Sequence, residues 1–265
     1  MASPASYATP SPTTDGLTLR MIAQALFHTM LWPAAAAVSL SVSVGGPDVT
    51  RLGLLLVACG TMAAYGLDRW IDRRDQDPAR FRRVLAVCVI LAALGTAGLA
   101  CTAWWRVSVC AVLGLIAGAY VPLKRFVPKN VLTTVAWTVA TCTLPLDSQP
   151  AWVPAFQASV AAVALIMAAN TVLCDIPDFA ADREAGVRGI TPRFGPKAGA
   201  IAAVTCGVLG AWVAASAGRW GLAATALGLA ILALLLVRNP SQGLFRRLAD
   251  GLVTVVPGPV ALLFR

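Results

Sequence analysis

Two pairs of aspartates could do chemistry, because in each pair the second aspartate follows the first by four positions. The first pair is Asp68 and Asp72, and the second is Asp178 and Asp182. On a helix, positions i and i+4 lie on one face, so each pair presents two carboxylates in the same direction, where they repel each other. Mg²⁺ is bound by carboxylates, waters and substrate phosphate oxygens. The two pairs together therefore predict a site where divalent ions hold a diphosphate and neutralise its charge.

A single pair of this kind is also typical of a solvated helix end just outside a membrane. Two pairs at equivalent places on one side of the protein favour the magnesium–diphosphate site over that interpretation. Carboxylates at membrane depth are candidates for function by default. Asp175 lies close to the second pair and is a further candidate metal ligand.

The amino-acid composition indicates whether the protein that positions these carboxylates lies in water or in a membrane. Of the 265 residues, 58% are hydrophobic and 12% are charged, whereas a soluble domain carries about 25% charged residues. The bilayer is therefore the expected solvent. The net charge of +9 comes from basic residues in short loops between apolar runs. This pattern is typical of membrane orientation and excludes a groove for nucleic acid.

The apolar runs predict an all-α membrane protein with nine transmembrane helices, since a span needs about 20 apolar residues. Residues 1–16 are expected to form a disordered tail, and residues 17–265 the membrane domain. The ninth span contains Pro257 and Pro259 and is expected to be kinked or to cross the membrane only in part. The predicted spans are 20–44, 51–70, 82–105, 107–123, 129–147, 152–174, 197–217, 219–238 and 243–264.

The basic residues predict the orientation of these spans. With a cytoplasmic N-terminus, seventeen of the 21 lysines and arginines fall on the cytoplasmic side and four on the other. Both aspartate pairs, with the acidic residues around them, then reach the cytoplasmic face of the cell (inner) membrane. They stand about four helices apart, which predicts two four-helix pseudo-repeats plus one helix.

Three further residues have a functional and a structural interpretation. His28, the only histidine, is expected to line an acceptor cavity or to be a hydrogen-bonded buried histidine. Asn170 lies eight residues before Asp178, on roughly the same helical face, and is expected either in the cavity or in an interhelical hydrogen bond. Pro177 is expected to break the sixth span, which would either re-aim Asp178 and Asp182 or simply end a helix.

Several segments resemble the UbiA superfamily of intramembrane prenyltransferases. The stretch DIPDFAADREAG (residues 175–186) is similar to the second aspartate motif of that family, and the stretch from Gly186 to Gly195 is similar to the loop that follows it. DRWID (residues 68–72) resembles the second half of the first motif. Tyr-Val-Pro-Leu-Lys-Arg (residues 120–125) resembles the segment after the fourth helix.

The resemblance implies nine helices around a central cavity that opens to the cytoplasm. It also implies a reaction in which Mg²⁺ holds a prenyl diphosphate and the prenyl group passes to an acceptor, here unidentified. Lys124, Arg125, Arg69 and Arg183 would contact the diphosphate, although the last two have carboxylate neighbours as alternative partners. Tyr120 would line the cavity. The metal ligands implied are Asp68, Asp72, Asp178 and Asp182.

The chain departs from the family pattern in both aspartate motifs and in the loops that follow them. Ala64 stands where the first motif usually begins with Asn, and Cys174 stands where the second usually has Asn or Asp. The leading prediction is a prenyltransferase. The alternatives are a non-catalytic or transport-type lipid-binding relative and a membrane terpene cyclase. A CDP-alcohol phosphotransferase is disfavoured because its long aspartate motif is absent.

Overall fold

The computed structural model describes residues 18–45, 48–72, 77–123, 126–147, 153–238 and 242–263, with the side chains of 72, 121, 237, 238 and 242–247 outside that description. Within these ranges the chain is helical, and the one backbone pairing of β type is an isolated bridge between Val49 and Leu146. The predicted tail at residues 1–16 lies outside the described residues.

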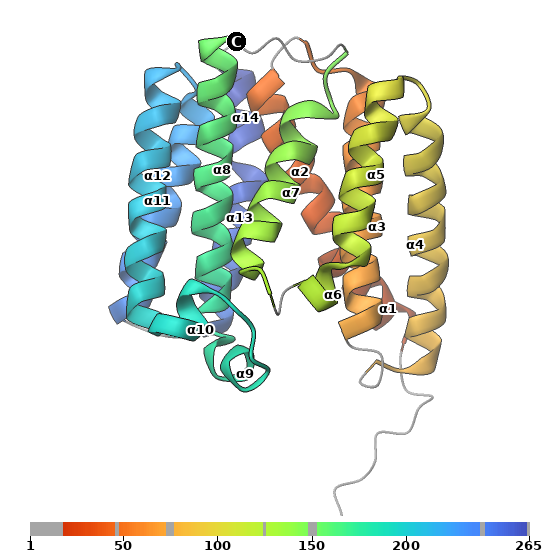
Figure 1. Cartoon of the computed structure of the whole chain (residues 1–265), viewed down its shortest axis with the longest axis horizontal. Coiled ribbons are helices and arrows are strands. Elements are labelled where there is room, and N and C mark those ends of the chain that lie inside the picture. The colour runs from red at the N-terminus through yellow and green to blue at the C-terminus, as the bar shows by residue number, and fades with distance from the viewer. Residues whose placement is uncertain are drawn as a thin grey trace, which may run out of the picture.

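Most of the helices run the length of the molecule (Figure 1), as expected for a chain whose apolar runs are long enough to cross a bilayer. Their bounds are α1 Leu19–Leu26, η1 Phe27–Leu31, α2 Trp32–Gly45, α3 Arg51–Asp72, α4 Ala79–Ala100, α5 Trp104–Gly118, α6 Tyr120–Leu123, α7 Lys129–Thr143, α8 Pro154–Asp175, α9 Phe179–Glu184, α10 Ile190–Phe194, α11 Pro196–Ser216, α12 Trp220–Arg238, α13 Gln242–Val255 and α14 Pro257–Leu263.

These bounds follow the predicted apolar segments to within a few residues, with breaks inside three of them. Five helical segments of the described chain have the length and hydropathy of a membrane span, and three apolar helices are shorter. The chain is therefore a multi-pass membrane protein. The count of nine spans and the pseudo-repeats stay predictions. The five spans are Leu19–Gly45, Arg51–Ile71, Ala79–Ala100, Pro154–Asp175 and Pro196–Ser216.

The helices pack closely because small residues line their contacts, as is usual inside a membrane. A Cβ atom added at Gly207 on α11 would lie 2.7 Å from the carbonyl oxygen of Ala226 on α12. One at Gly210 would lie 3.2 Å from the Cβ of Leu165 on α8. The lack of a side chain at both glycines therefore allows α8, α11 and α12 to approach closely.

Hydroxyl side chains inside the bundle donate hydrogen bonds to backbone carbonyls of their own helices. Ser41, Thr141 and Thr225 are fully buried, and each donates a hydrogen bond of 2.7–2.8 Å to the carbonyl four residues earlier. With no water at this depth, such bonds avoid the cost of a buried hydroxyl without a partner.

Prolines account for the breaks in the long helices. Pro33 has no N–H, and the turn before it widens into the π-helix η1, where Trp32 N donates to the carbonyl of Phe27. Pro177 follows the end of α8 at Asp175, and Pro257 begins α14. The kink predicted in the last span and the break predicted at Pro177 are both confirmed.

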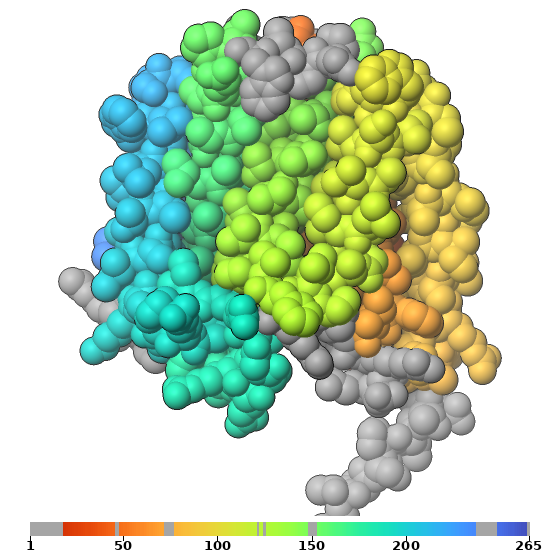
Figure 2. Space-filling model, in the orientation of Figure 1, coloured from red at the N-terminus to blue at the C-terminus, as the bar shows by residue number. Residues whose placement is uncertain are grey.

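Figure 1 shows α6, α9 and α10 at one end of the bundle, the lower end in that view. The second aspartate motif belongs to this end, because it joins α8 to α9. In Figure 2 the α9–α10 segment, in teal, protrudes from the bundle beside the start of α7. The polar residues of interest are therefore positioned where helices stop, and not along their middles.

Candidate functional site

The centre of the site is an ammonium group between two aspartates of the second motif. Lys129 Nζ lies 2.8 Å from Asp175 Oδ1 and 2.5 Å from Asp182 Oδ2. The exposed fractions of the three side chains are 17%, 5% and 16% respectively, so water screens these contacts poorly. Two carboxylates within 3 Å strongly favour the charged form of the amine. The three groups together carry a formal charge of −1.

Asn130, the next residue along α7, completes the contacts of Asp175. Its Nδ2 donates a 2.7 Å hydrogen bond to Asp175 Oδ2, and both residues are buried. Each oxygen of Asp175 therefore accepts from a donor on α7. A buried carboxylate is stable only when it is paired and hydrogen-bonded in this way.

Backbone contacts hold the start of α7 against the loop between α9 and α10. Lys129 N donates to the carbonyl of Arg188 at 3.1 Å, and Arg188 Nη1 donates to the carbonyl of Phe126 at 3.2 Å. Val187 N donates to the carbonyl of Asp182 at 2.9 Å. The start of α7 and the loop after α9, two segments far apart in sequence, are thereby fixed around the Lys129 ammonium.

The first motif reaches the same end of the molecule. Asp68 is half-buried in the last turns of α3, and Asp72 is the last residue of that helix, its side chain outside the description. The Tyr120 hydroxyl hydrogen-bonds Thr133 and interacts electrostatically with Asp68, Lys129 and Asp175. Tyr120 therefore lies near enough to both motifs for its hydroxyl to interact with their charges.

A second tyrosine connects the first motif with α8 and α13. The Tyr65 hydroxyl accepts a 2.9 Å hydrogen bond from Trp137 Nε1, and the two rings meet edge to face. Tyr65 also interacts electrostatically with Asp68, Cys174 and Asp250. The Cys174 thiol lies 3.7 Å from Asp250 Oδ1. The position where the family has Asn or Asp thus holds a weak donor to a carboxylate of α13.

Arg69 has the carboxylate partner that the sequence offered as an alternative to diphosphate. Its Nε and Nη2 atoms donate to the two oxygens of Asp77 at 3.0 and 2.9 Å, and Nη1 donates to Thr29 Oγ1 at 3.3 Å. Its guanidinium also lies over the ring of Phe81, 5.1 Å from the centroid. These contacts fix the end of α3 to η1 and to the start of α4.

The remaining predicted residues divide into buried, exposed and undescribed ones. Asn170 is 9% exposed, and its Oδ1 atom is buried without a hydrogen-bond partner among the described residues. His28 is exposed on η1 beside Phe27, so the interpretation as a buried histidine is wrong. Arg183 is exposed, 5.9 Å from the ring centroid of Phe179. Lys124 and Arg125 lie outside the described residues.

The donor set fits Mg²⁺ in its chemistry. The side chains near Lys129 and Tyr120 offer carboxylate oxygens, the donor type that Mg²⁺ prefers. The described residues contain no group of three or more His, Cys, Asp or Glu side chains arranged to hold a metal by themselves. Mg²⁺ does not require such a cage, since it is usually bound through one or two carboxylates together with waters and substrate phosphates.

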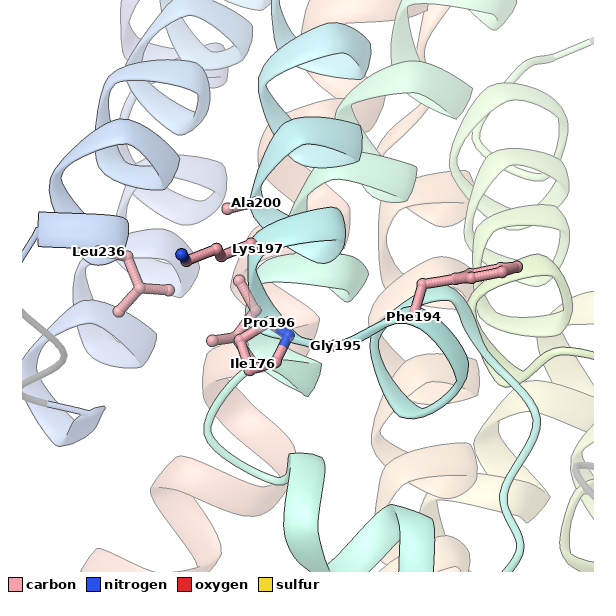
Figure 3. A pocket seen from close by; sticks show the side chains of 7 residues that line it. All are labelled: Ile176, Phe194, Gly195, Pro196, Lys197, Ala200 and Leu236. Atoms are coloured by element: carbon pink, nitrogen blue, oxygen red, sulfur yellow. The ribbon is translucent and has the colours of Figure 1, made fainter.

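A separate groove of about 540 Å³ lies between the junction of α10 with α11 and the C-terminal part of α12. Figure 3 shows Lys197 and Leu236 facing each other across it, with Ile176 and Pro196 below. Its lining contains none of the aspartates, so it is distinct from the acidic site.

Sequence reasoning missed Lys129, Asn130, Tyr65 and Asp250. Lys129 was counted only as a loop cation, because nothing in the sequence relates it to Asp175, 46 positions later. The sequence does contain one indication of their role: a lysine and an asparagine directly follow Pro128, at the start of an apolar helix. Polar side chains at a span end are candidates for partners of buried carboxylates.

The sequence model described as the UbiA prenyltransferase family matches residues 30–246. No curated protein sequence is significantly similar to the chain. Solved structures of known proteins share its fold, and two of them cover nearly the whole chain. The first is the apo structure of a UbiA homolog from Aeropyrum pernix K1, with a TM-score of 0.67 and 16% identity over 90% of this chain and 98% of that one.

The second concerns digeranylgeranylglyceryl phosphate synthase in membranes. It has a TM-score of 0.55 and 12% identity over 92% of this chain and 99% of that one. At these identities the likeness shows the fold alone. The helical arrangement described above is therefore the one seen in UbiA structures, over nearly the whole length of both chains.

Proposed function

This chain belongs to the UbiA prenyltransferase family, and from that premise we propose that it moves a prenyl group from a magnesium-bound prenyl diphosphate to an acceptor. The observation that carries the proposal is the approach of the two aspartate motifs at one end of the bundle. Tyr120 supports it, because its hydroxyl interacts electrostatically with residues of both motifs, Asp68 and Asp175, and with Lys129.

The proposed ligands of Mg²⁺ are Asp68, Asp72, Asp178 and Asp182. When bound, Mg²⁺ would neutralise the charge that develops on the departing diphosphate. Asp68 and Asp178 would orient the diphosphate from opposite sides. Lys124 and Arg125, in the segment between α6 and α7, would contact its oxygens.

The transfer breaks the bond between the allylic carbon and the diphosphate oxygen, and it forms a bond from that carbon to the acceptor. The acceptor loses a proton in the same process. Water would capture the allylic carbon in competition, so the apolar walls of the bundle serve to exclude it. The acceptor is expected to be a molecule that dissolves in the bilayer.

Binding of a prenyl diphosphate analogue tests the site directly. We expect purified protein to bind geranyl thiolodiphosphate, which resists ionisation, only when Mg²⁺ is present. Asp68→Asn and Asp178→Asn should each weaken binding by about 100-fold, because each removes a charge that holds the metal. Asp147→Asn is the matched control, because Asp147 follows the end of α7, which lies away from α9 in Figure 1. Equal affinity for all three variants would refute the assignment.

Two related functions give different results with a labelled natural diphosphate. A non-catalytic or transport-type relative binds it without releasing inorganic diphosphate. A membrane terpene cyclase releases inorganic diphosphate with no acceptor present. The proposed transferase releases it only when an acceptor is added, for example in a lipid extract.

A further inference from the structure

The Lys129 ammonium occupies the kind of position that a divalent cation takes in an acidic motif. It lies between carboxylates from two different segments, the end of α8 and the short helix α9, at 2.8 and 2.5 Å. Without a cation, two carboxylates so placed would repel each other at low exposure. A protein side chain therefore already provides the neutralisation for which the motif would otherwise need a metal.

The surrounding contacts leave little capacity for a second ion at Asp175. Its Oδ1 contacts Lys129 and its Oδ2 contacts Asn130, while the residue is 4% exposed. A metal there would have to displace both donors from a buried carboxylate, and dehydration makes Mg²⁺ reluctant to enter such a site. Asp175 is therefore suited to holding Lys129, and not to binding the metal itself.

Lys129 is also held in place and does not reach its partners from a flexible loop. Pro128 restricts the backbone just before Lys129. The backbone N–H of Lys129 donates a hydrogen bond to the carbonyl of Arg188. Asn130 is bound to Asp175 at the same time. The start of α7 therefore fixes the position of the ammonium. A charge held in this way is preorganised, whereas the long side chains of a surface ion pair must lose freedom to meet.

We propose that Lys129 is a built-in cation that replaces one divalent ion of the diphosphate site, so that this chain binds its substrate with a single metal ion. Of the four proposed ligands, Asp68, Asp72 and Asp178 hold that metal, whereas Asp182 pairs with Lys129. The Lys129 ammonium faces the diphosphate from the side of Asp175 and Asp182. The inference rests on the proposed function and adds to it the number of metals and a positioning role for Asp175.

Counting bound Mn²⁺ tests the inference without any measurement of turnover. Mn²⁺ replaces Mg²⁺ and is followed by its electron paramagnetic resonance signal, in purified full-length protein with saturating geranyl thiolodiphosphate. We expect one bound ion per chain for the wild type and for Lys129→Arg. Lys129→Met should bind two, because Asp175 and Asp182 then lack a cation. Lys197→Met, at an exposed lysine of α11, is the matched control and should bind one.

The wild-type count is decisive even if Lys129→Met does not fold. Two ions bound to the wild type would overturn the inference while leaving the proposed function in place. One ion bound to correctly folded Lys129→Met would also overturn it. A wild type that binds neither Mn²⁺ nor the thiolodiphosphate would instead contradict the proposed function itself.

Discussion

At the residue scale, a substitution at Asn170 can distinguish a structural role of this side chain from a role in substrate binding. Its Oδ1 is buried without a hydrogen-bond partner among the described residues, and such an acceptor costs about 1–3 kcal/mol of stability. We expect Asn170→Leu to fold with an unchanged or raised melting temperature and to bind geranyl thiolodiphosphate about tenfold less tightly. Thermal unfolding and titration of the same sample measure both effects. A fall in melting temperature with unchanged affinity would assign Asn170 to an interhelical hydrogen bond.

Spacing along the chain reveals pairs of residues but not their distant partners. Asp178 and Asp182 could be recognised because they lie four positions apart in a specific motif. Lys129 could not be assigned to them, since its partners lie 46 and 53 residues away and meet it only in the folded bundle. The ion pair of Arg69 with Asp77 was foreseen only as one of two alternatives, because a nearby carboxylate and a diphosphate attract a guanidinium in the same way.

At the element scale, we propose that the break after α8 aims the second motif. Pro177 cannot donate a backbone hydrogen bond, so α8 ends at Asp175 and α9 begins afresh at Phe179. We expect Pro177→Ala to let the helix continue, to turn Asp182 away from Lys129 and to change the direction of Asp178. A misplacement of about 1 Å is worth roughly 100-fold in such sites. Analogue binding should therefore fall by about that factor.

Pro257→Ala is the control for this experiment, because it also removes a proline from a helix break but lies far along the chain from the motif. Helical content measured by circular dichroism should stay the same or rise slightly in both variants. Unchanged analogue binding by Pro177→Ala would show that the break is an ordinary helix end.

Helix positions were predictable from the sequence, whereas the irregular turns were not. The bilayer requires long apolar runs, so the bounds of α3, α8 and α11 differ by only a few residues from the predicted ones. The π-helical turn η1 and the separate helix α6 depend on local backbone geometry, which leaves no periodic signal. Both lie next to the site, where departures from regular helix are most common.

At the scale of the whole molecule, the orientation in the membrane follows from the excess of Lys and Arg on one side. We propose that the acidic end faces the cytoplasm and that the N-terminus lies on the same side. Cys101 offers a native reporter, since it is exposed just after α4, at the end of the bundle opposite α9. A membrane-impermeant maleimide should label intact bacterial cells that express the protein, and Cys101→Ser should abolish that labelling. Labelling that requires permeabilised cells would show that the protein has the opposite orientation.

The most direct test of the central claim follows inorganic diphosphate release and prenylated product from labelled geranylgeranyl diphosphate with a native lipid extract. The account predicts that both appear together, that both require Mg²⁺, and that Asp68→Asn and Asp178→Asn each lower them by about 100-fold or more while Asp147→Asn does not. Release and product that are unaffected by chelation of Mg²⁺, or by loss of either aspartate, would contradict it.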